Sequence, residues 1–137
     1  MRDQLASASL AVLLIAACGS EEEIVPSEEE RLAQAPNIEL GERRFRQCAP
    51  CHNRAPDAGH RVGPNLWGIS GQNAGRFPDF SYSRAMQRSE LVWDDATIDA
   101  YITDPQGLIP GNRMAYNGMP SEADRRDLIA YLATLQD

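Results

Sequence analysis

The stretch "QCAPCHNR", residues 47–54, decides how the rest of the chain is interpreted. It places Cys48 and Cys51 two residues apart and puts His52 directly after the second cysteine. Such a pair can exchange electrons as a dithiol, can bind a metal ion, or can attach a larger group covalently. The residues that surround the motif distinguish these three possibilities.

The segments around the motif are predicted to be short helices joined by loops. Asn37, Asp94 and Ser121 are suitable N-caps, and Asp124 lies where a capping box would need it. Residues 53–82 are rich in glycine and proline, and no stretch alternates apolar and polar residues as a strand would. The fold class is therefore predicted to be all-α. Its predicted helices are residues 37–47, 83–88, 94–104, where Pro105 should end the helix, and a last one starting at Ser121.

This all-α context disfavours two of the three possibilities. A redox-active dithiol normally lies at a helix N-terminus beside a strand, and no strand is predicted. A structural zinc site needs four ligands, but only the two cysteines, His52 and His60 are available, at a spacing that fits no common site. The pattern C-x-x-C-H is the signature of covalent haem attachment, in which both thiols bond to the porphyrin and the histidine binds the iron. A large apolar cofactor would also supply the core that such a small domain lacks.

A second iron ligand is expected in the loop "IPGNRMAY". It places Met114 after a Pro-Gly turn, 62 residues beyond His52. Met119 is a rival ligand, but it lacks the Pro-Gly setting. With this loop, the chain resembles the class I cytochromes c of the mitochondrial and bacterial c2 type from about Gly41 to Leu135. The residues that carry the resemblance are Phe45, Trp93, Tyr101 and the motifs "CAPCH", "GPNLWG", "FSYS", "IPGNRM" and "DLIAYL".

The resemblance implies a cytochrome c fold of short helices and loops around one covalent haem c. It implies thioether bonds from Cys48 and Cys51, and iron ligation by His52 and Met114. Around the haem, the resemblance implies that the Pro64 carbonyl accepts a hydrogen bond from the free ring nitrogen of His52. It also implies that Tyr82 and Trp93 bind a haem propionate and that Tyr101 lies near the Met114 sulfur. Away from the haem, it implies that Gly41 allows the first helix to cross the last, where Phe45 meets Leu128 and Tyr131.

A few positions depart from the pattern of the family. Many members have an arginine near Gln72 that screens a propionate, and here Arg76 would have to substitute. Met86 stands where a polar residue is common, and Asn112 replaces a common threonine. His60 lies in a polar loop and is expected to be solvated.

The start of the chain resembles a bacterial lipoprotein signal. An apolar run ends in Ile15-Ala16-Ala17-Cys18, and it is too short to span a bilayer. The resemblance implies that residues 1–17 are a signal peptide and that Cys18 is lipidated. An ordinary cleaved signal, leaving a soluble periplasmic protein, and an uncleaved anchor are the alternatives. Residues 18–36 carry two Glu triplets and are predicted to be a disordered tether before a cytochrome c domain at 37–137.

The charge balance limits the possible partners. The net charge is −7, there is no lysine, and residues 36–137 hold 13 acidic residues against 11 arginines. Nucleic-acid binding therefore has no electrostatic support. Several of the arginines near the two ligand segments are expected to form a cationic rim that docks redox partners, the alternative being a scattered set of surface charges. The arginines in question are Arg43, Arg44, Arg46, Arg54, Arg61 and Arg113.

The predicted function is one-electron transfer in a respiratory chain. The carrier would be tethered at the periplasmic side of a membrane and would shuttle between a cytochrome bc1-type complex and a terminal oxidase. It would not be an enzyme. A small haem peroxidase whose Met114 dissociates is one alternative, and a non-haem redox or zinc protein is another.

Overall fold

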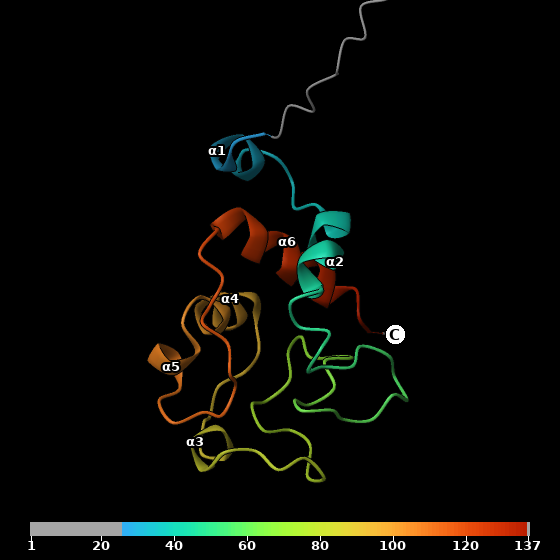
Figure 1. The fold of residues 1–137 in the computed structure, drawn as a ribbon, viewed down its shortest axis with the longest axis vertical. Coiled ribbons are helices and arrows are strands. Elements are labelled where there is room, and N and C mark those ends of the chain that lie inside the picture. Colours follow the sequence, from blue (N-terminus) through green and yellow to red (C-terminus); the bar gives the residue numbers. More distant parts are fainter. Residues whose placement is uncertain (1–25, 137) are drawn as a thin grey trace, which may run out of the picture.

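A computed structural model describes residues 26–136 of the chain, and Figure 1 shows their helices joined by long loops. Within this range there is no strand, only an isolated antiparallel bridge between Asn73 and Val92. The all-α prediction is therefore confirmed. The helices are α1 (Glu28–Leu32), α2 (Ile38–Phe45), α3 (Arg84–Gln87), α4 (Asp95–Thr103), α5 (Pro105–Leu108) and α6 (Glu122–Ala133).

The predicted caps form as the sequence indicates. The side chain of Asn37 accepts the Leu40 amide at 2.9 Å, and Asp94 caps α4 in the same way. Ser121 accepts the Asp124 amide at 3.2 Å, but the Asp124 carboxylate pairs with two arginines outside α6 instead of reaching back to the cap. Each cap satisfies an amide that would otherwise lack a partner at the start of a helix.

The loop expected after α4 contains an additional short helix. Asp104 ends α4 and caps α5, accepting the Gly107 amide at 2.9 Å. Pro105 occupies the first position of α5, where its missing N–H costs nothing and its fixed φ is already helical. The proline that ends one helix therefore begins the next.

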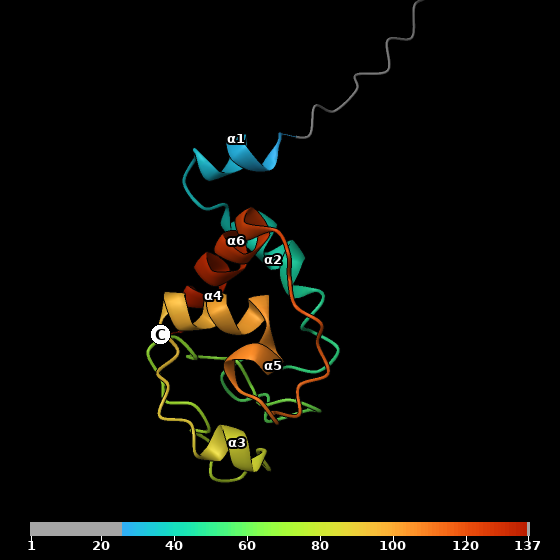
Figure 2. The same ribbon diagram turned by 90° about the vertical axis from the view of Figure 1, so that its left-hand side faces the viewer.

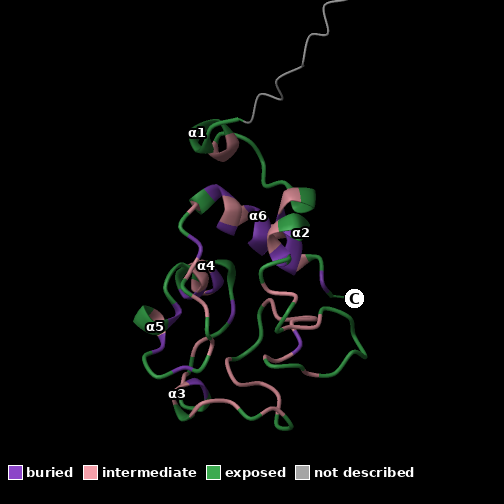
Figure 3. Ribbon diagram, in the orientation of Figure 1, coloured by how far each residue is buried: buried purple, intermediate pink, exposed green. Residues whose placement is uncertain are grey.

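Helices α2 and α6 cross closely, and this crossing depends on Gly41. A Cβ atom at Gly41 would overlap the carbonyl oxygen of Asp127 and would lie 2.7 Å from Cβ of Tyr131. Beside it, the rings of Phe45 and Tyr131 meet edge to face with centroids 5.6 Å apart. Leu128 is 1% exposed and belongs to the same core. In Figure 3 the buried residues are accordingly concentrated along α2 and α6.

The expectation of a disordered tether over residues 18–36 is wrong for its second part. Ser27 and Glu30 form a complete capping box that starts α1, and α1 lies against α6. Acidic composition alone suggested disorder, but Glu30 completes the capping box and Glu28 accepts hydrogen bonds from Ser121 and Ala123. Residues 1–25, with the predicted signal peptide and Cys18, lie outside the described residues.

The arrangement along the molecule is clear from two directions. Figures 1 and 2 both place α1 at one end of the long axis, the crossing of α2 and α6 beside it, and α3 near the other end. The glycine- and proline-rich loops run between these helices. No helix in the described range is both long and apolar enough to cross a membrane.

Candidate functional site: a cavity behind the cysteine motif

A cavity of about 610 Å³ lies between α6, α4, α3 and the loops. Its walls are mainly apolar, with Leu128 and Leu132 contributed by α6, Ile98 by α4 and Met86 by α3. This volume is in the range of sites that enclose a small organic ligand. All the predicted site residues that the structure describes line this one cavity: Cys48, Cys51, His52, Pro64, Tyr82, Trp93, Tyr101 and Met114. Their roles toward haem stay predictions.

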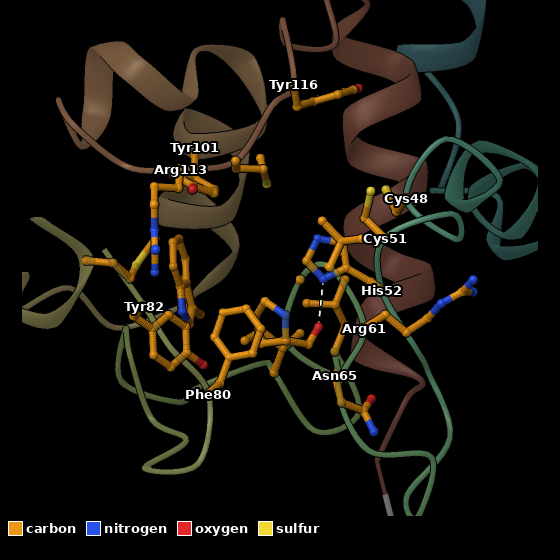
Figure 4. A pocket seen from close by; sticks show the side chains of 18 of the residues that line it. Cys48, Cys51, His52, Arg61, Asn65, Phe80, Tyr82, Tyr101, Arg113 and Tyr116 are labelled. Carbon is orange, nitrogen blue, oxygen red and sulfur yellow. Dashed lines mark hydrogen bonds between the residues drawn. The ribbon is translucent and has the colours of Figure 1, made fainter. Parts of the chain in front are cut away.

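The cysteine motif forms helical turns that continue from α2. The Cys51 amide donates to the Cys48 carbonyl at 3.0 Å, and the His52 amide donates to the same oxygen at 2.9 Å. This turn brings both thiols and the imidazole to one side of the cavity (Figure 4). Both cysteines are free, and burial raises the pKa of the Cys48 thiol to about 11, with Cys51 adding to the effect. A reactive dithiol needs a lowered pKa, so the site is unsuited to thiol exchange.

The imidazole of His52 is held by the segment that follows the motif. Its Nδ1–H donates to the Pro64 carbonyl at 2.6 Å, the dashed line in Figure 4. A Cβ atom at Gly63 would overlap the ring and would lie 2.7 Å from Nε2, so only glycine lets the backbone lie flat against it. Burial lowers the pKa of His52, and the hydrogen bond to Pro64 partly opposes this. A neutral imidazole with a fixed tautomer and an available Nε2 is the form that binds a metal.

Met114 and its neighbour Arg113 also line the cavity, and Figure 4 shows Arg113 with Tyr82 and Tyr101 across from His52. The rival Met119 is not part of the lining. It is 3% exposed within the hydrophobic core, and its amide donates to Ile102. The geometry therefore favours Met114 over Met119 as the residue that can reach a group in the cavity.

Two polar residues to which the sequence analysis assigned no positioning role hold the Met114 loop in place. Asn112 is 7% exposed, donates to the carbonyls of Pro105 and Ile109, and accepts the Met114 amide at 2.8 Å. Arg125 binds Asp99 at 2.8 Å and donates to the carbonyls at the end of the loop, residues 119–120. An asparagine two residues before Met114 is a typical turn signal that could have indicated its role. The side chain of Arg125 gave no such signal.

The aromatic residues present polar atoms to an otherwise apolar space. Trp93 and Tyr101 lie with ring centroids 4.9 Å apart, and both are 8% exposed. Both Trp93 and Tyr101 line the cavity. Burial raises the pKa of Tyr101 to about 12 and also raises the pKa of Tyr82. Their polar atoms are available to a group bound in the cavity.

The expectation that His60 is solvated is wrong. His60 is not solvated: its Nδ1 accepts the Asn65 amide at 3.0 Å, and its ring packs edge-on against Phe77 and Phe80. The expectation failed because a polar local sequence does not show which aromatic residues close over it. Arg76 lines the cavity, donates to the carbonyls of Trp67 and Gly68, and keeps a buried Nε without a partner.

These features fit a haem rather than a bare metal ion. In the described part of the chain, no three His, Cys, Asp or Glu residues come together as a metal site. The two thiols, the imidazole and the Met114 side chain instead border one apolar cavity, and among the described residues Arg76 contributes a buried Nε without a partner to its lining. This is the donor set that covalent attachment and iron ligation of a porphyrin require.

Comparison with known proteins supports the same conclusion. The chain is 46% identical over 88 residues to a cytochrome c2 of Rhodoplanes tepidamans, covering 64% of this chain and 82% of that protein. It is 39% identical over 102 residues to the cytochrome c of Sesamum indicum, covering 72% of this chain and 92% of that protein. The chain belongs to the cytochrome c family. As a cytochrome c it is a mono-haem electron carrier and not an enzyme, so the peroxidase and zinc alternatives are set aside.

The fold comparison agrees with this assignment. Cytochrome cH from Methylobacterium extorquens superposes with a TM-score of 0.68 at 34% identity, covering 72% of this chain and 98% of that protein. The predicted cytochrome c fold is therefore confirmed. No protein-family model matches the chain.

Proposed function

We propose that this cytochrome c carries single electrons while a lipid on Cys18 holds it at the periplasmic side of a membrane. It shuttles between a cytochrome bc1-type complex and a terminal oxidase. The observation that carries the proposal is the cavity bordered by both thiols, His52 and Met114. The family supports the electron-carrier part, and the sequence before Glu21 supports the anchor.

The chain's own residues define how it would hold its cofactor. Cys48 and Cys51 would form the thioethers, and His52 and Met114 would be the two iron ligands. When bound, the haem supplies a one-electron couple whose potential His/Met ligation raises. The hydrogen bond to Pro64 orients the His52 ring, and it would hold the imidazole in the same position when the iron changes oxidation state.

The surroundings of the site keep water and other reactants away. Leu128, Leu132 and Met86 give the cavity apolar walls. In such a low-dielectric space, charges on the cofactor would interact more strongly with nearby protein groups than they would in water. Trp93 and Tyr82 would hydrogen-bond a propionate, and Tyr101 would lie near the Met114 sulfur. The guanidinium of Arg76, whose pKa burial lowers, would face the same carboxylate through its free Nε.

The test of the site compares two methionine variants of the purified holoprotein. Met114→Leu should retain one covalent haem by mass but lose the methionine–iron absorption band. Met119→Leu should keep the band, because Met119 lies in the core away from the cavity. Loss of the band in Met119→Leu alone would show that the ligand assignment is wrong.

The test of the anchor is the mass of the mature protein and its distribution between membrane and soluble fractions. Acyl chains at residue 18 and membrane association that Cys18→Ser abolishes would support the proposal. If the mature protein is soluble in the periplasm and carries no acyl chains, the anchor proposal is wrong and the signal is an ordinary cleaved one. Two or more acyl chains are needed for stable attachment, so the mass also predicts how firmly the protein is held.

A further inference from the structure

Residues 27–37, here called the clasp, tie the start of the described chain to the N-terminal half of α6. Glu28 accepts hydrogen bonds from the Ser121 hydroxyl at 2.9 Å and from the Ala123 amide at 3.1 Å. At the other end of α1, Arg126 donates to the carbonyls of Leu32 and Arg31. We propose that the clasp fixes where the N-terminal arm leaves the domain and shortens the tether that joins the domain to the membrane.

The centre of the clasp is a compact group of charges. Arg31 binds Asp124 and Asp127, each at 2.7 Å, and the Asn37 amide donates to Asp127 at 2.8 Å. Arg44 of α2 binds Asp124 from the other side at 2.9 Å. The side chain of Asp127 is 2% exposed and that of Arg31 is 16% exposed. Because water is largely excluded, salt screens these pairs much less than surface pairs, and removal of one partner leaves a buried charge.

The clasp and the cavity use different parts of α6. The clasp contacts Ser121, Asp124 and Asp127, whereas Leu128 and Leu132 face the cavity. No residue from 26 to 46 lines the cavity. Figures 1 and 2 place α1 at the end of the long axis. The chain therefore enters the domain with α6 between its point of entry and the cofactor site.

Docking of the clasp changes the reach of the tether, an inference that rests on the proposed anchor at Cys18. At about 3.6 Å per residue, the chain from Cys18 to Ser27 spans at most about 32 Å, and from Cys18 to Asn37 at most about 68 Å. A docked clasp thus halves the greatest distance between domain and membrane. The docked clasp also orients the domain so that the α1 end faces the membrane and the cavity remains accessible to redox partners.

The clasp is tested in the full-length holoprotein with Glu28→Ala/Arg126→Ala. This pair removes the contacts at both ends of α1 but keeps Arg31 as a trypsin site and as the partner of Asp127. The matched control is Glu29→Ala/Arg43→Ala, which changes the same charges at exposed side chains without contacts to α6. Trypsin cleavage after Arg31 should be faster than in the control by a factor on the order of ten or more.

Hydrogen exchange in the same proteins shows whether the clasp opens by itself. Amides of α1 should lose protection in the double variant, together with the Ala123 amide that donates to Glu28, whereas the amides of α6 beyond its first turn should keep it. Cleavage rates equal to the control would overturn the proposal. An equal loss of protection in α6 beyond its first turn would also overturn it, because the clasp would then be part of the core and not a separate element.

The tether length is tested with the lipidated protein on phosphatidylcholine vesicles that carry a headgroup fluorophore. Energy transfer from the fluorophore to the haem should be stronger for the wild type than for Glu28→Ala/Arg126→Ala, because the docked tether is shorter. Equal transfer would overturn the inference about reach. If the wild type carries no acyl chain and does not bind the vesicles, the proposed anchor fails, while cleavage and exchange still decide whether the clasp exists.

Discussion

At the residue scale, the position of His52 depends on its neighbour Gly63 as much as on its own sequence. The Gly63 amide donates to the Cys51 carbonyl at 2.8 Å, which closes the loop over the motif. The next residue, Pro64, accepts the hydrogen bond from the ring. One short segment therefore supplies both the surface on which the imidazole lies and the acceptor that orients it.

Gly63→Ala should displace the His52 ring, because the added methyl group overlaps it. Overpacking of this kind costs about 1–3 kcal/mol, so the denaturant midpoint of the holoprotein should fall by a corresponding amount. The measurement is unfolding followed by the haem spectrum. Asp57→Ala is the control, since Asp57 is exposed, lies outside the cavity lining and should change the midpoint little. An unchanged midpoint for Gly63→Ala would contradict the close packing.

The candidate site residues could be predicted from the sequence because they come from short motifs with their own chemistry. The pairing of Cys48, Cys51 and His52 was evident from spacing, and a Pro-Gly turn distinguished Met114. The side chains that hold these residues were not evident. Arg125, for example, acts through contacts with Asp99 and two loop carbonyls, which only the folded chain brings together.

At the element scale, the crossing of α2 and α6 joins residues from both ends of the domain. The two helices meet at Gly41, where any side chain would contact backbone and not a movable side-chain tip. Arg54 seals the edge of this crossing, with its guanidinium 5.3 Å from the Phe45 ring centroid and a hydrogen bond to the Tyr131 hydroxyl. The crossing is therefore stiff and intolerant of added volume.

Gly41→Ala should be among the most damaging single changes in the domain. The new methyl group would force α2 away from α6 at the Asp127 carbonyl, at a cost of about 3 kcal/mol or more. The free energy of unfolding from denaturant titration measures this loss. Glu39→Ala, at an exposed position of the same helix, serves as the control and should stay within about 0.5 kcal/mol of the wild type.

The docking of α1 should depend on pH through Glu28. Hydrogen bonds from the Ala123 amide, and then from Ser121, hold the pKa of Glu28 below its ordinary value. Because the pKa of Glu28 is lower in the folded than in the unfolded chain, its carboxylate stabilises the docked α1 at pH values above the ordinary glutamate pKa. This stabilisation is lost as the pH falls through the pKa of Glu28 in the folded chain. The Ala123 amide chemical shift should therefore titrate with an inflection below the ordinary glutamate pKa. Glu28→Gln should abolish this inflection, and an inflection at or above the ordinary value would contradict the assignment.

The helices themselves were predictable where a cap and an apolar face coincide, as at Asn37 and Ser121. Helix α1 was missed because the prediction relied on composition, although Ser27 and Glu30 already have the spacing of a capping box. What stabilises α1 is Asp127, which lies 96 residues from Arg31 in the chain. A contact so distant in sequence leaves no local pattern.

At the scale of the whole molecule, the six arginines of the expected rim are not equivalent. Arg44 and Arg54 already pair with carboxylates of the same chain, Asp124 and Glu42 respectively. Arg61 and Arg113 line the cavity, and among residues 26–136 they hydrogen-bond only to backbone carbonyls, so no carboxylate in that range neutralises their charges. These two are the best candidates to meet an acidic partner surface.

Arg61→Gln/Arg113→Gln should slow electron transfer to a terminal oxidase several-fold at low salt and flatten its dependence on ionic strength. The measurement is the second-order rate constant over a series of salt concentrations. Arg84→Gln/Arg88→Gln, a pair on and next to α3 and outside the cavity lining, removes the same charge and should alter the rate less. A wild-type rate that does not respond to salt would contradict a cationic docking rim.

The long sequence separation between the clasp and its partners in α6 also determines when, during synthesis of the chain, the clasp can form. Arg31 and Asn37 are synthesised well before their partner Asp127, which follows them by 96 and 90 residues in the chain. A chain delivered across a membrane from its N-terminus cannot dock the clasp until α6 has arrived and folded. Processing enzymes that act on the start of the chain would thus meet it open, and the clasp would close only on a completed domain.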